Sequence, residues 1–479
     1  WGDDGNIIAA LNNRGVLSRV PSTGGTSAPV TKLNEGENTH RWPQVLPGTQ
    51  AVLFTAVQSQ GTTSYDEAKI EVLSLRTGER KTLHQGGFFG RYLADAPGSG
   101  SGGTAANGMG HLVYLRESTA FAVPFDPGKL AVLGAPVPLL QDVSSNATGG
   151  GDFAFARNGT FVYLAGKASQ SAWPISWVDG GQAPKPLHAP PGQYVHPRFS
   201  PDGKRLAFSM SNGKGRDIWV KDLNRDAPSR LSFLPGTNSN PVWTPDAKTI
   251  VFRSTNPAAP GLFAIRADGS GEARRLTDGK AEETPSSFSP DGKRLAITQT
   301  GNGGSVDVFT VAVEADAGPG GPGLRLGKPE LFLATPFNEN YPEFSPDGRW
   351  LAYQSNESGR YEVYLRPFVM PGGARGGRWQ VSTGGGVRPA WSRDGRELLY
   401  LALDGRVMAA GYTGKGESFA AGTPRVWTEV QVRLAGVSGR NYDLTPDGKR
   451  LAAMVADEAN GEKLPTHLTV LLNFTDELR

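Results

Sequence analysis

The 479-residue chain contains no cysteine and no long apolar run. The missing cysteine excludes disulfides, thiolate metal sites and a cysteine nucleophile, and is compatible with any redox compartment. No stretch approaches the 18 or more apolar residues that a membrane helix needs, so we expect no membrane contact within this chain. The first residues, WGDDGNIIAA, also lack the basic and apolar regions of a signal peptide. Because the sequence opens in mid-pattern on Trp1, we expect natural sequence upstream of it.

Charge of one sign and catalytic motifs are also scarce. The 49 basic and 46 acidic residues give a net charge of +3 and form no long run, so we expect no nucleic-acid partner. No G-x-S-x-G elbow, phosphate-binding loop or kinase signature occurs. The six histidines form no H-E-x-x-H pair, and no D-x-D-x-D-G calcium loop is present. The sequence therefore predicts no catalytic residue, no metal and no cofactor.

Turn residues, by contrast, are abundant. Glycine (64) and proline (36) make up about a fifth of the chain, which is below the level typical of disordered sequences. Apolar and polar residues alternate with a period of two in HPRFS, RLAFSMS, DIWVKDL and SRLSF, between residues 196 and 233. No long amphipathic helix is visible. The pattern predicts an all-β protein built from many short strands.

One motif returns along the chain: FSPDGKRLAF at 199–208 recurs as FSPDGKRLAI at 288–297 and LTPDGKRLAA at 444–453. We take the aromatic or apolar residue before each such turn as the anchor of a unit. The anchors of the second half are Phe199, Trp243, Phe288, Phe344, Trp391 and Leu444. In the first half the same place is held by Trp1, Val45 and Phe155, with Leu93 as a weaker candidate. A spacing of about 40 to 45 residues with four strands per unit is typical of β-propeller blades.

The ten units predict a β-propeller architecture with two readings. We favour two modules, a degenerate four-unit module at residues 1–190 and a six-bladed propeller at 191–479; the alternative is a single large ring. The last unit ends after what we take as its third strand, THLTVLLNF. Its fourth strand must then come from elsewhere, and PKPLHA (184–189) is our candidate for closing the second ring.

The repeated turn is better explained by architecture than by chemistry. In Ser200-Pro201-Asp202-Gly203, proline presets the backbone for a type I turn, and glycine takes the left-handed conformation that returns the chain as a hairpin. All six later units have an acidic residue in this turn: Asp202, Asp246, Asp291, Asp347, Asp394 and Asp447. Identical turns of successive blades lie far apart around a ring, so these carboxylates cannot share one metal ion.

The repeats FSPDGKRLAF, FSPDGRWLAYQSNESGRYEVYLRPF and WSRDGRELLYL resemble the TolB-like propeller repeat. Their succession, from WGDDGNII to the terminal VLLNFTDELR, resembles the C-terminal region of bacterial membrane-bound serine/threonine protein kinases. In that family a cytoplasmic kinase domain and a membrane helix precede extracytoplasmic repeats. The resemblance implies an extracytoplasmic bacterial location, either periplasmic or at the cell surface or secreted. Two readings stay open: a membrane tether stands upstream of this sequence, or the chain is a free-standing secreted relative. It supplies no catalytic residue for the propeller part.

One group of residues remains as a candidate binding site. Three residues before each anchor lies the entrance of the innermost strand, which in five of the six later units holds His196, Asn240, Tyr341, Arg388 and Asn441. In a closed ring these side chains gather at one mouth of the central channel, where propellers commonly bind ligands. The competing interpretation is plain solvent exposure at a strand end.

These observations favour a non-catalytic binding, sensor or scaffold module, linked to a kinase, that binds a peptide, a protein partner or a small ligand at the channel mouth. The alternative is a secreted propeller enzyme acting on polysaccharide or peptide. A hydrolase domain of the prolyl-oligopeptidase kind has no room within this sequence, because it ends about 35 residues after the last anchor.

Overall fold

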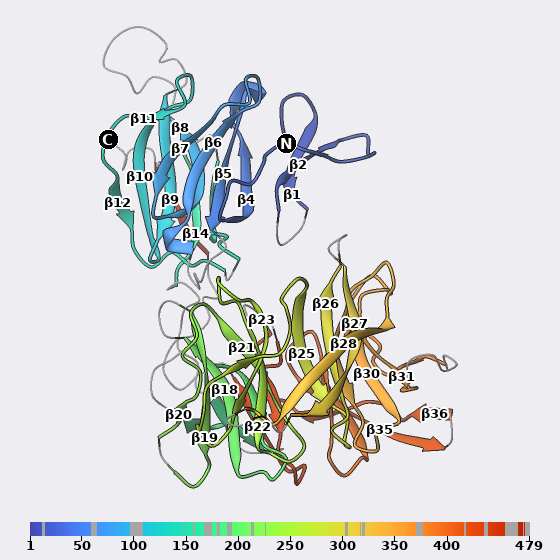
Figure 1. Ribbon diagram of the computed structural model, residues 1–479. Helices are drawn as coiled ribbons and strands as arrows, with labels where there is room; N and C mark the ends of the chain where they lie inside the picture. Colours follow the sequence, from blue (N-terminus) through green and yellow to red (C-terminus); the bar gives the residue numbers. More distant parts are fainter. Residues whose placement is uncertain are drawn as a thin grey trace, which may run out of the picture. The chain divides into compact units, whose positions relative to one another are not determined.

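A computed structural model describes residues 1–11, 15–58, 65–95, 109–146, 148–156, 159–166, 175–179, 183–188, 194–211, 215–225, 227–301, 305–316, 318, 321–369, 377–415, 418–434, 439–455, 468–472 and 474. In this part of the chain the regular elements are β-strands and two short 3-10 helices, so the all-β prediction is confirmed (Figure 1). The chain divides into two compact units. Unit 1 comprises residues 1–171 and 461–479, and unit 2 comprises residues 172–460.

Unit 1 contains four antiparallel sheets in the described residues. They are formed by β1 (Asn6–Ala10), β2 (Leu17–Pro21) and β3 (Ala28–Pro29); β4 (Glu37–Val45), β5 (Ala51–Gln58), β6 (Lys69–Ser74) and β7 (Arg80–Gln85); β8 (Phe88–Ala94), β9 (Gly110–Arg116), β10 (Thr119–Asp126), β11 (Ala131–Val132) and β12 (Val137–Leu140); and β13 (Phe153–Phe155), β14 (Phe161–Leu164) and β40 (Leu468–Leu471). The 3-10 helices η1 (Pro47–Thr49) and η2 (Tyr65–Glu67) flank β5 and β6.

Unit 2 contains six antiparallel sheets in the described residues, and most have four strands. They are formed by β17 (Tyr194–Phe199), β18 (Arg205–Ser211), β19 (Arg216–Asp222) and β20 (Ser229–Arg230); β21 (Asn238–Trp243), β22 (Thr249–Ser254), β23 (Gly261–Arg266) and β24 (Arg274–Arg275); β25 (Glu282–Phe288), β26 (Arg294–Thr300), β27 (Val306–Ala315) and β28 (Leu324–Leu333); β29 (Glu339–Phe344), β30 (Trp350–Ser355), β31 (Glu362–Pro367) and β32 (Trp379–Gln380); β33 (Val387–Trp391), β34 (Glu397–Leu401), β35 (Val407–Lys415), β36 (Ser418–Ala421) and β37 (Arg425–Thr428); and β15 (Ile175–Asp179), β16 (Lys185–His188), β38 (Tyr442–Leu444) and β39 (Arg450–Met454).

The first strands of neighbouring sheets contact one another, in the order β17, β21, β25, β29 and β33, and β38 contacts β17. These inner strands therefore line the axis of unit 2. Apolar side chains fill the space between the sheets, as the alternating pattern requires. The anchor Trp243, for example, packs with Ala207 and Ile218 of the preceding sheet.

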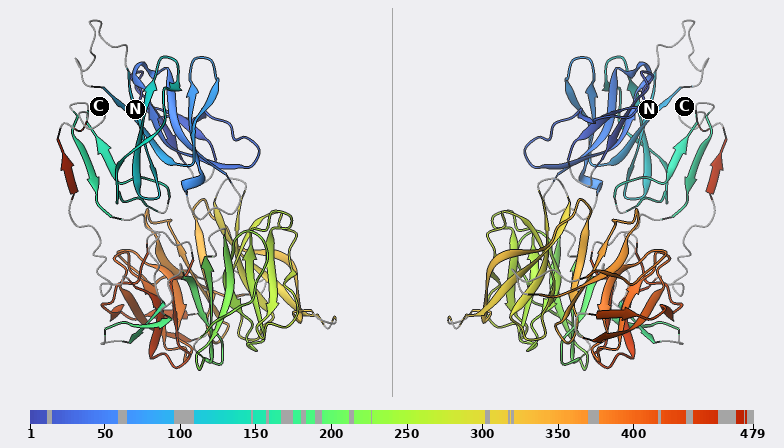
Figure 2. Two further views of the ribbon diagram at one scale, coloured as in Figure 1. Left: turned by 90° about the vertical axis from the view of Figure 1, so that its left-hand side faces the viewer. Right: turned by 90° about the vertical axis from the view of Figure 1, so that its right-hand side faces the viewer.

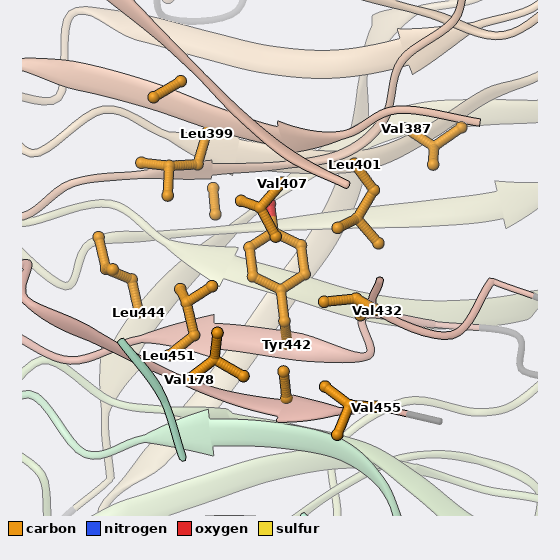
Figure 3. Packing of buried hydrophobic residues seen from close by; sticks show 13 residues of the cluster. Val178, Val387, Leu399, Leu401, Val407, Val432, Tyr442, Leu444, Leu451 and Val455 are labelled. Atoms are coloured by element: carbon orange, nitrogen blue, oxygen red, sulfur yellow. The ribbon is translucent and has the colours of Figure 1, made fainter. Parts of the chain in front are cut away.

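The last sheet of unit 2 joins two distant parts of the chain. Its order is β16-β15-β39-β38, so strands from residues 175–188 complete the sheet begun by β38 and β39. Val178 of β15 packs beside Leu451 of β39 and Tyr442 of β38 (Figure 3). The prediction that the segment around 184–189 closes this sheet is confirmed for β16; Ala189 lies outside the described residues.

The expectation for THLTVLLNF was wrong. The third strand of the last sheet is β15, whereas β40, which comes from that segment, pairs with β14 of unit 1. Figure 2 shows the red strand β40 beside the blue-green strand β14. The division into units consequently differs from the expected 1–190 and 191–479 at both ends: β15 and β16 belong to unit 2, and residues 461–479 belong to unit 1.

The repeated turn has the predicted geometry. The N–H of Gly203 donates a hydrogen bond to the carbonyl of Ser200 at 2.9 Å, and Gly203 has φ 70°. Asp202 Oδ1 accepts hydrogen bonds from the Ser200 hydroxyl at 2.5 Å and from the Lys204 N–H at 3.1 Å. The carboxylate therefore satisfies the backbone of its own turn, as the sequence predicts. In one of the six turns Ala247 occupies the glycine position, with φ 59°.

Candidate functional site in the inner strands of unit 2

The candidate residues lie at a bulge that recurs in the inner strands. The pairing of inner strand and second strand shifts register after Val195, Ser239, Asn340 and Val387. The residue that follows each shift has a left-handed backbone, with φ between 54° and 58°: His196, Asn240, Tyr341 and Arg388. Proline follows each of them in the sequence. Because proline has no N–H, it fits a bulge in which a ladder hydrogen bond is lost.

Left-handed backbone is costly for residues with a side chain, so neighbouring groups must hold these bulges in place. The N–H of Arg388 donates to Gln354 Oε1 at 2.9 Å, and its carbonyl accepts a hydrogen bond from the Tyr442 hydroxyl at 2.9 Å. The N–H of Asn240 donates to Nδ1 of His196 at 3.3 Å. That hydrogen bond places the proton of a neutral His196 ring on Nε2.

Unit 1 repeats this bulge with apolar side chains. Trp42 and Phe89 each have φ 55° and follow the same register shift in β4 and β8. Counting three residues on from Phe89 leads to Tyr92, so the anchor of this strand is Tyr92 and the expected anchor Leu93 is displaced by one residue. The bulge is thus a property of the repeat, while the polar side chains on it are a property of unit 2.

A pocket brings three of the five predicted residues together. His196, Asn240 and Tyr341 line it with Arg198, Glu343 and Arg440, and the space between the protein atoms is about 360 Å³, part of it open to solvent. The lining comes from the inner strands β17, β21, β25 and β29 and from the residue two positions before β38. The structure therefore places this pocket at the axis of unit 2.

The other two predicted residues do not line this pocket. Arg388 is only 7% exposed; its side chain hydrogen bonds that of Tyr341, and burial lowers the pKa of its guanidinium. Asn441 is fully buried, and its Nδ2 donates to the carbonyl of Arg433. Arg388 therefore supports a lining residue from behind, whereas Asn441 has a structural contact.

The charged residues of the pocket form a network that sequence reasoning missed. Arg440 binds Glu343 through two nitrogens, with Nη2 to Oε2 at 2.6 Å and Nη1 to Oε1 at 3.3 Å, and its Nη1 lies 3.4 Å from Oδ1 of Asp443. Nη2 of Arg198 lies 3.7 Å from Oε1 of Glu343. Burial disfavours the charge of Arg440, but Glu343 and Asp443 outweigh that effect and raise its pKa. Burial and the nearby Arg440 lower the pKa of Arg198.

A sequence signal for this network existed. Arg198, Glu343 and Asp443 each stand one residue before an anchor, where Val242 and Ala390 occur in other units. The side chain two residues after the bulge residue points to the same face of the strand as the side chain of the bulge residue. The remaining unit has Ser287 here, so three of the six units carry a charge at a place that is uncharged in the others, which indicates a polar channel.

The pocket is lined by both charged and polar side chains. In the described ranges, no three His, Asp or Glu side chains come together as metal ligands. The described part of the chain also has no helix that is long and apolar enough to span a membrane. The pocket offers hydrogen-bond donors, buried charges and a tyrosine hydroxyl.

The repeat geometry agrees with a comparison against protein families. Residues 158–318, about a third of the chain, match the TolB beta propeller domain. This match and the repeated antiparallel sheets support a TolB-like propeller fold. A comparison with curated protein sequences finds no match.

Solved structures were also compared with the chain. It is similar to a putative TolB from Agrobacterium tumefaciens, with 16% identity and a TM-score of 0.45 over 60% of this chain and 99% of that one. TolB from Acinetobacter baumannii has 16% identity and a TM-score of 0.37, covering 75% of this chain and 77% of that one. A puromycin-hydrolyzing peptidase from Mycobacterium tuberculosis has 16% identity and a TM-score of 0.36, covering 69% and 45%. Because all three scores are below 0.5, the fold assignment rests on the sheets themselves and on the family match.

Proposed function

We propose that this chain is a non-catalytic binding module whose TolB-like propeller takes part of a peptide, protein or small ligand into the pocket of unit 2. The observation that carries the proposal is the convergence of three left-handed residues, His196, Asn240 and Tyr341, on one pocket. Because the same left-handed bulge carries apolar side chains in unit 1, the polar side chains on it, and not the backbone conformation, support ligand binding. A ligand that gathers these donors would be oriented by groups fixed in advance.

The hydrogen bonds within the pocket favour binding over catalysis. A catalytic site needs a nucleophile or a proton donor held beside a base. Here the Glu343 carboxylate is occupied by Arg440, and the Tyr341 hydroxyl accepts a hydrogen bond from a backbone N–H. These contacts suit recognition of a ligand rather than transfer of its protons.

We also propose that the module lies outside the cytoplasm and serves a kinase-linked signalling protein. Its support is the resemblance of the repeat succession to the extracytoplasmic region of bacterial membrane-bound kinases. The test is protease access to the native protein in intact cells and in spheroplasts. Digestion of the propeller only after lysis would contradict the extracytoplasmic location.

The binding function is tested by selecting peptides from a random phage-displayed library on the purified chain and measuring the selected peptides by calorimetry. Tyr341→Ala and Arg388→Ala should each weaken binding at least about tenfold, because the first removes a lining hydroxyl and the second its support. The control is Arg266→Gln, which changes an exposed ion pair with Asp268. If selected peptides bind both Ala variants and the wild type equally, the pocket is not the binding site.

A further inference from the structure

We propose that the pocket of unit 2 recognises an oxyanion, a carboxylate or phosphate group of the ligand, and that Arg198 is its principal contact. This inference rests on the proposed function, because it names the chemistry that the same pocket binds.

Several N–H donors of the Arg198 guanidinium are not used by the described protein groups. Its Nη2 donates to the carbonyl of Ser286 at 3.1 Å and lies 3.7 Å from Glu343 Oε1. No group among the described residues accepts a hydrogen bond from its Nε or Nη1, although a guanidinium carries five N–H donors. Since Arg198 lines the pocket, these donors are available to a ligand.

The acidic residues nearby are already committed to other partners. Both oxygens of Glu343 are bound by Arg440. Asp443 accepts the backbone N–H of Phe199 at 2.7 Å and lies 3.4 Å from Arg440. A carboxylate held by an arginine and a backbone N–H is a poor ligand for an incoming cation, because binding would break those contacts.

The charge balance of the pocket is positive. Arg198 and Arg440 are balanced by Glu343 and Asp443, and Arg388 behind Tyr341 adds a third guanidinium against two carboxylates. The guanidinium of Arg393, in the turn between β33 and β34, also disfavours the charge of Arg198. Burial together with Arg440 disfavours the charge of Arg198, so an anion placed against it would relieve an unfavourable environment.

Neutral donors complete the set. The Tyr341 hydroxyl oxygen accepts the N–H of Gly439 at 2.8 Å and shares a hydrogen bond with Arg388, which leaves its own O–H for an acceptor on the ligand. Asn240 Nδ2 has no protein acceptor among the described residues, and it lines the same pocket. Donors from the three inner strands β17, β21 and β29 thus line one pocket and match an acceptor-rich group.

The test is calorimetric titration of the full chain with inorganic phosphate and with the peptide acetyl-Gly-Gly carrying a free carboxylate, at constant ionic strength set by chloride. Saturable binding of at least one probe below about 10 mM is expected. Arg198→Gln should weaken it at least about tenfold, and Arg198→Lys, which keeps the charge, should weaken it less. Arg266→Gln removes the same charge from the exposed end of β23 and should leave the affinity unchanged.

The two probes distinguish a phosphate from a carboxylate source, and acetyl-Gly-Gly-amide must not bind. The inference is overturned if neither anion saturates below about 10 mM, or if Arg198→Gln and Arg198→Lys, both folded by thermal melting, bind as the wild type does. It is also overturned if calcium ions or a cationic peptide occupy the pocket and Glu343→Gln abolishes that binding. In that last case the binding function itself stands, because a ligand still depends on the pocket.

Discussion

The backbone N–H of Gly439 donates a hydrogen bond of 2.8 Å to the hydroxyl oxygen of Tyr341. Gly439 has φ 108°, and a Cβ atom built on it would lie 2.2 Å from Cδ2 of His196 and 3.0 Å from Nδ2 of Asn240. Residue 439 therefore rests directly on the candidate residues of three inner strands. Only glycine fits, both for its backbone conformation and for lack of space.

Gly439→Ala should lower the free energy of unfolding of unit 2 by about 1–3 kcal/mol, because it adds a clash with the His196 ring to an unfavourable φ. Urea denaturation with intrinsic fluorescence measures the change. The same variant should weaken any ligand that depends on Tyr341, since the segment must move away from the hydroxyl.

Gly384→Ala is the matched control. Gly384 has φ 101°, and a Cβ atom there meets nothing within 4 Å. The substitution therefore costs only the unfavourable backbone conformation of alanine, about 1 kcal/mol. Equal losses of stability in the two variants would show that the contact between Gly439 and His196 is absent.

Much of unit 2 could be predicted from sequence, because each of its repeats follows the same local rules of turn formation and strand alternation. The turn at Gly203, the buried anchors such as Trp243 and the closing strand β16 all followed from turn chemistry and period-two alternation. The assignment of β15 and β40 did not, since ISWVD and LTVL are both short segments in which apolar and polar residues are mixed. Which sheet each strand joins is decided by long-range pairing that local periodicity does not encode.

The site was predictable in position and less so in content. Counting three residues before the anchor located His196 and Tyr341 in the pocket, but the same count included Asn441, whose amide is buried against Arg433. The count also passed over Arg440, which lies outside any strand and reaches the pocket from the segment before β38. Loop residues of this kind are placed by tertiary packing.

Ala247→Gly should stabilise unit 2. Ala247 occupies the turn position with φ 59°, where the other five turns of unit 2 carry glycine. Relief of the left-handed strain is worth about 1 kcal/mol, partly offset by the greater freedom of glycine in the unfolded chain. A rise in Tm on calorimetry is expected, and the reverse change Gly292→Ala should lower it. A fall in Tm for Ala247→Gly would contradict the strain.

Glu339→Gln should change how stability depends on pH. Burial raises the pKa of Glu339, and the nearby Asp307 charge adds to the effect. The side chain is fully buried, and none of the described residues donates a hydrogen bond to its Oε2. In the unfolded chain the pKa is about 4.3. Because the folded pKa lies above the unfolded one, native stability falls as pH rises from the unfolded value through the folded one.

The amide of Gln mimics the protonated acid, so the variant should be more stable than the wild type near pH 7 and should lose that slope. Urea midpoints measured from pH 4 upward provide the comparison, with the exposed Glu429→Gln as a control. A Gln variant that keeps the wild-type slope would exclude Glu339 as its source.

Phe474→Ala should destabilise unit 1 without affecting unit 2, although residue 474 follows the whole of unit 2 in the sequence. Phe474 is 3% exposed, its ring stacks on Phe161 with centroids 4.3 Å apart, and its N–H donates to the carbonyl of Gly159 at 2.8 Å. Loss of such a buried ring costs about 3–5 kcal/mol. Hydrogen exchange should therefore accelerate in β13 and β14 and stay unchanged in β21 and β22. The neighbouring change Leu472→Ala, at a residue 73% exposed, should leave exchange in both units as in the wild type. Acceleration in β21 and β22 would show instead that the C-terminal segment packs as part of unit 2.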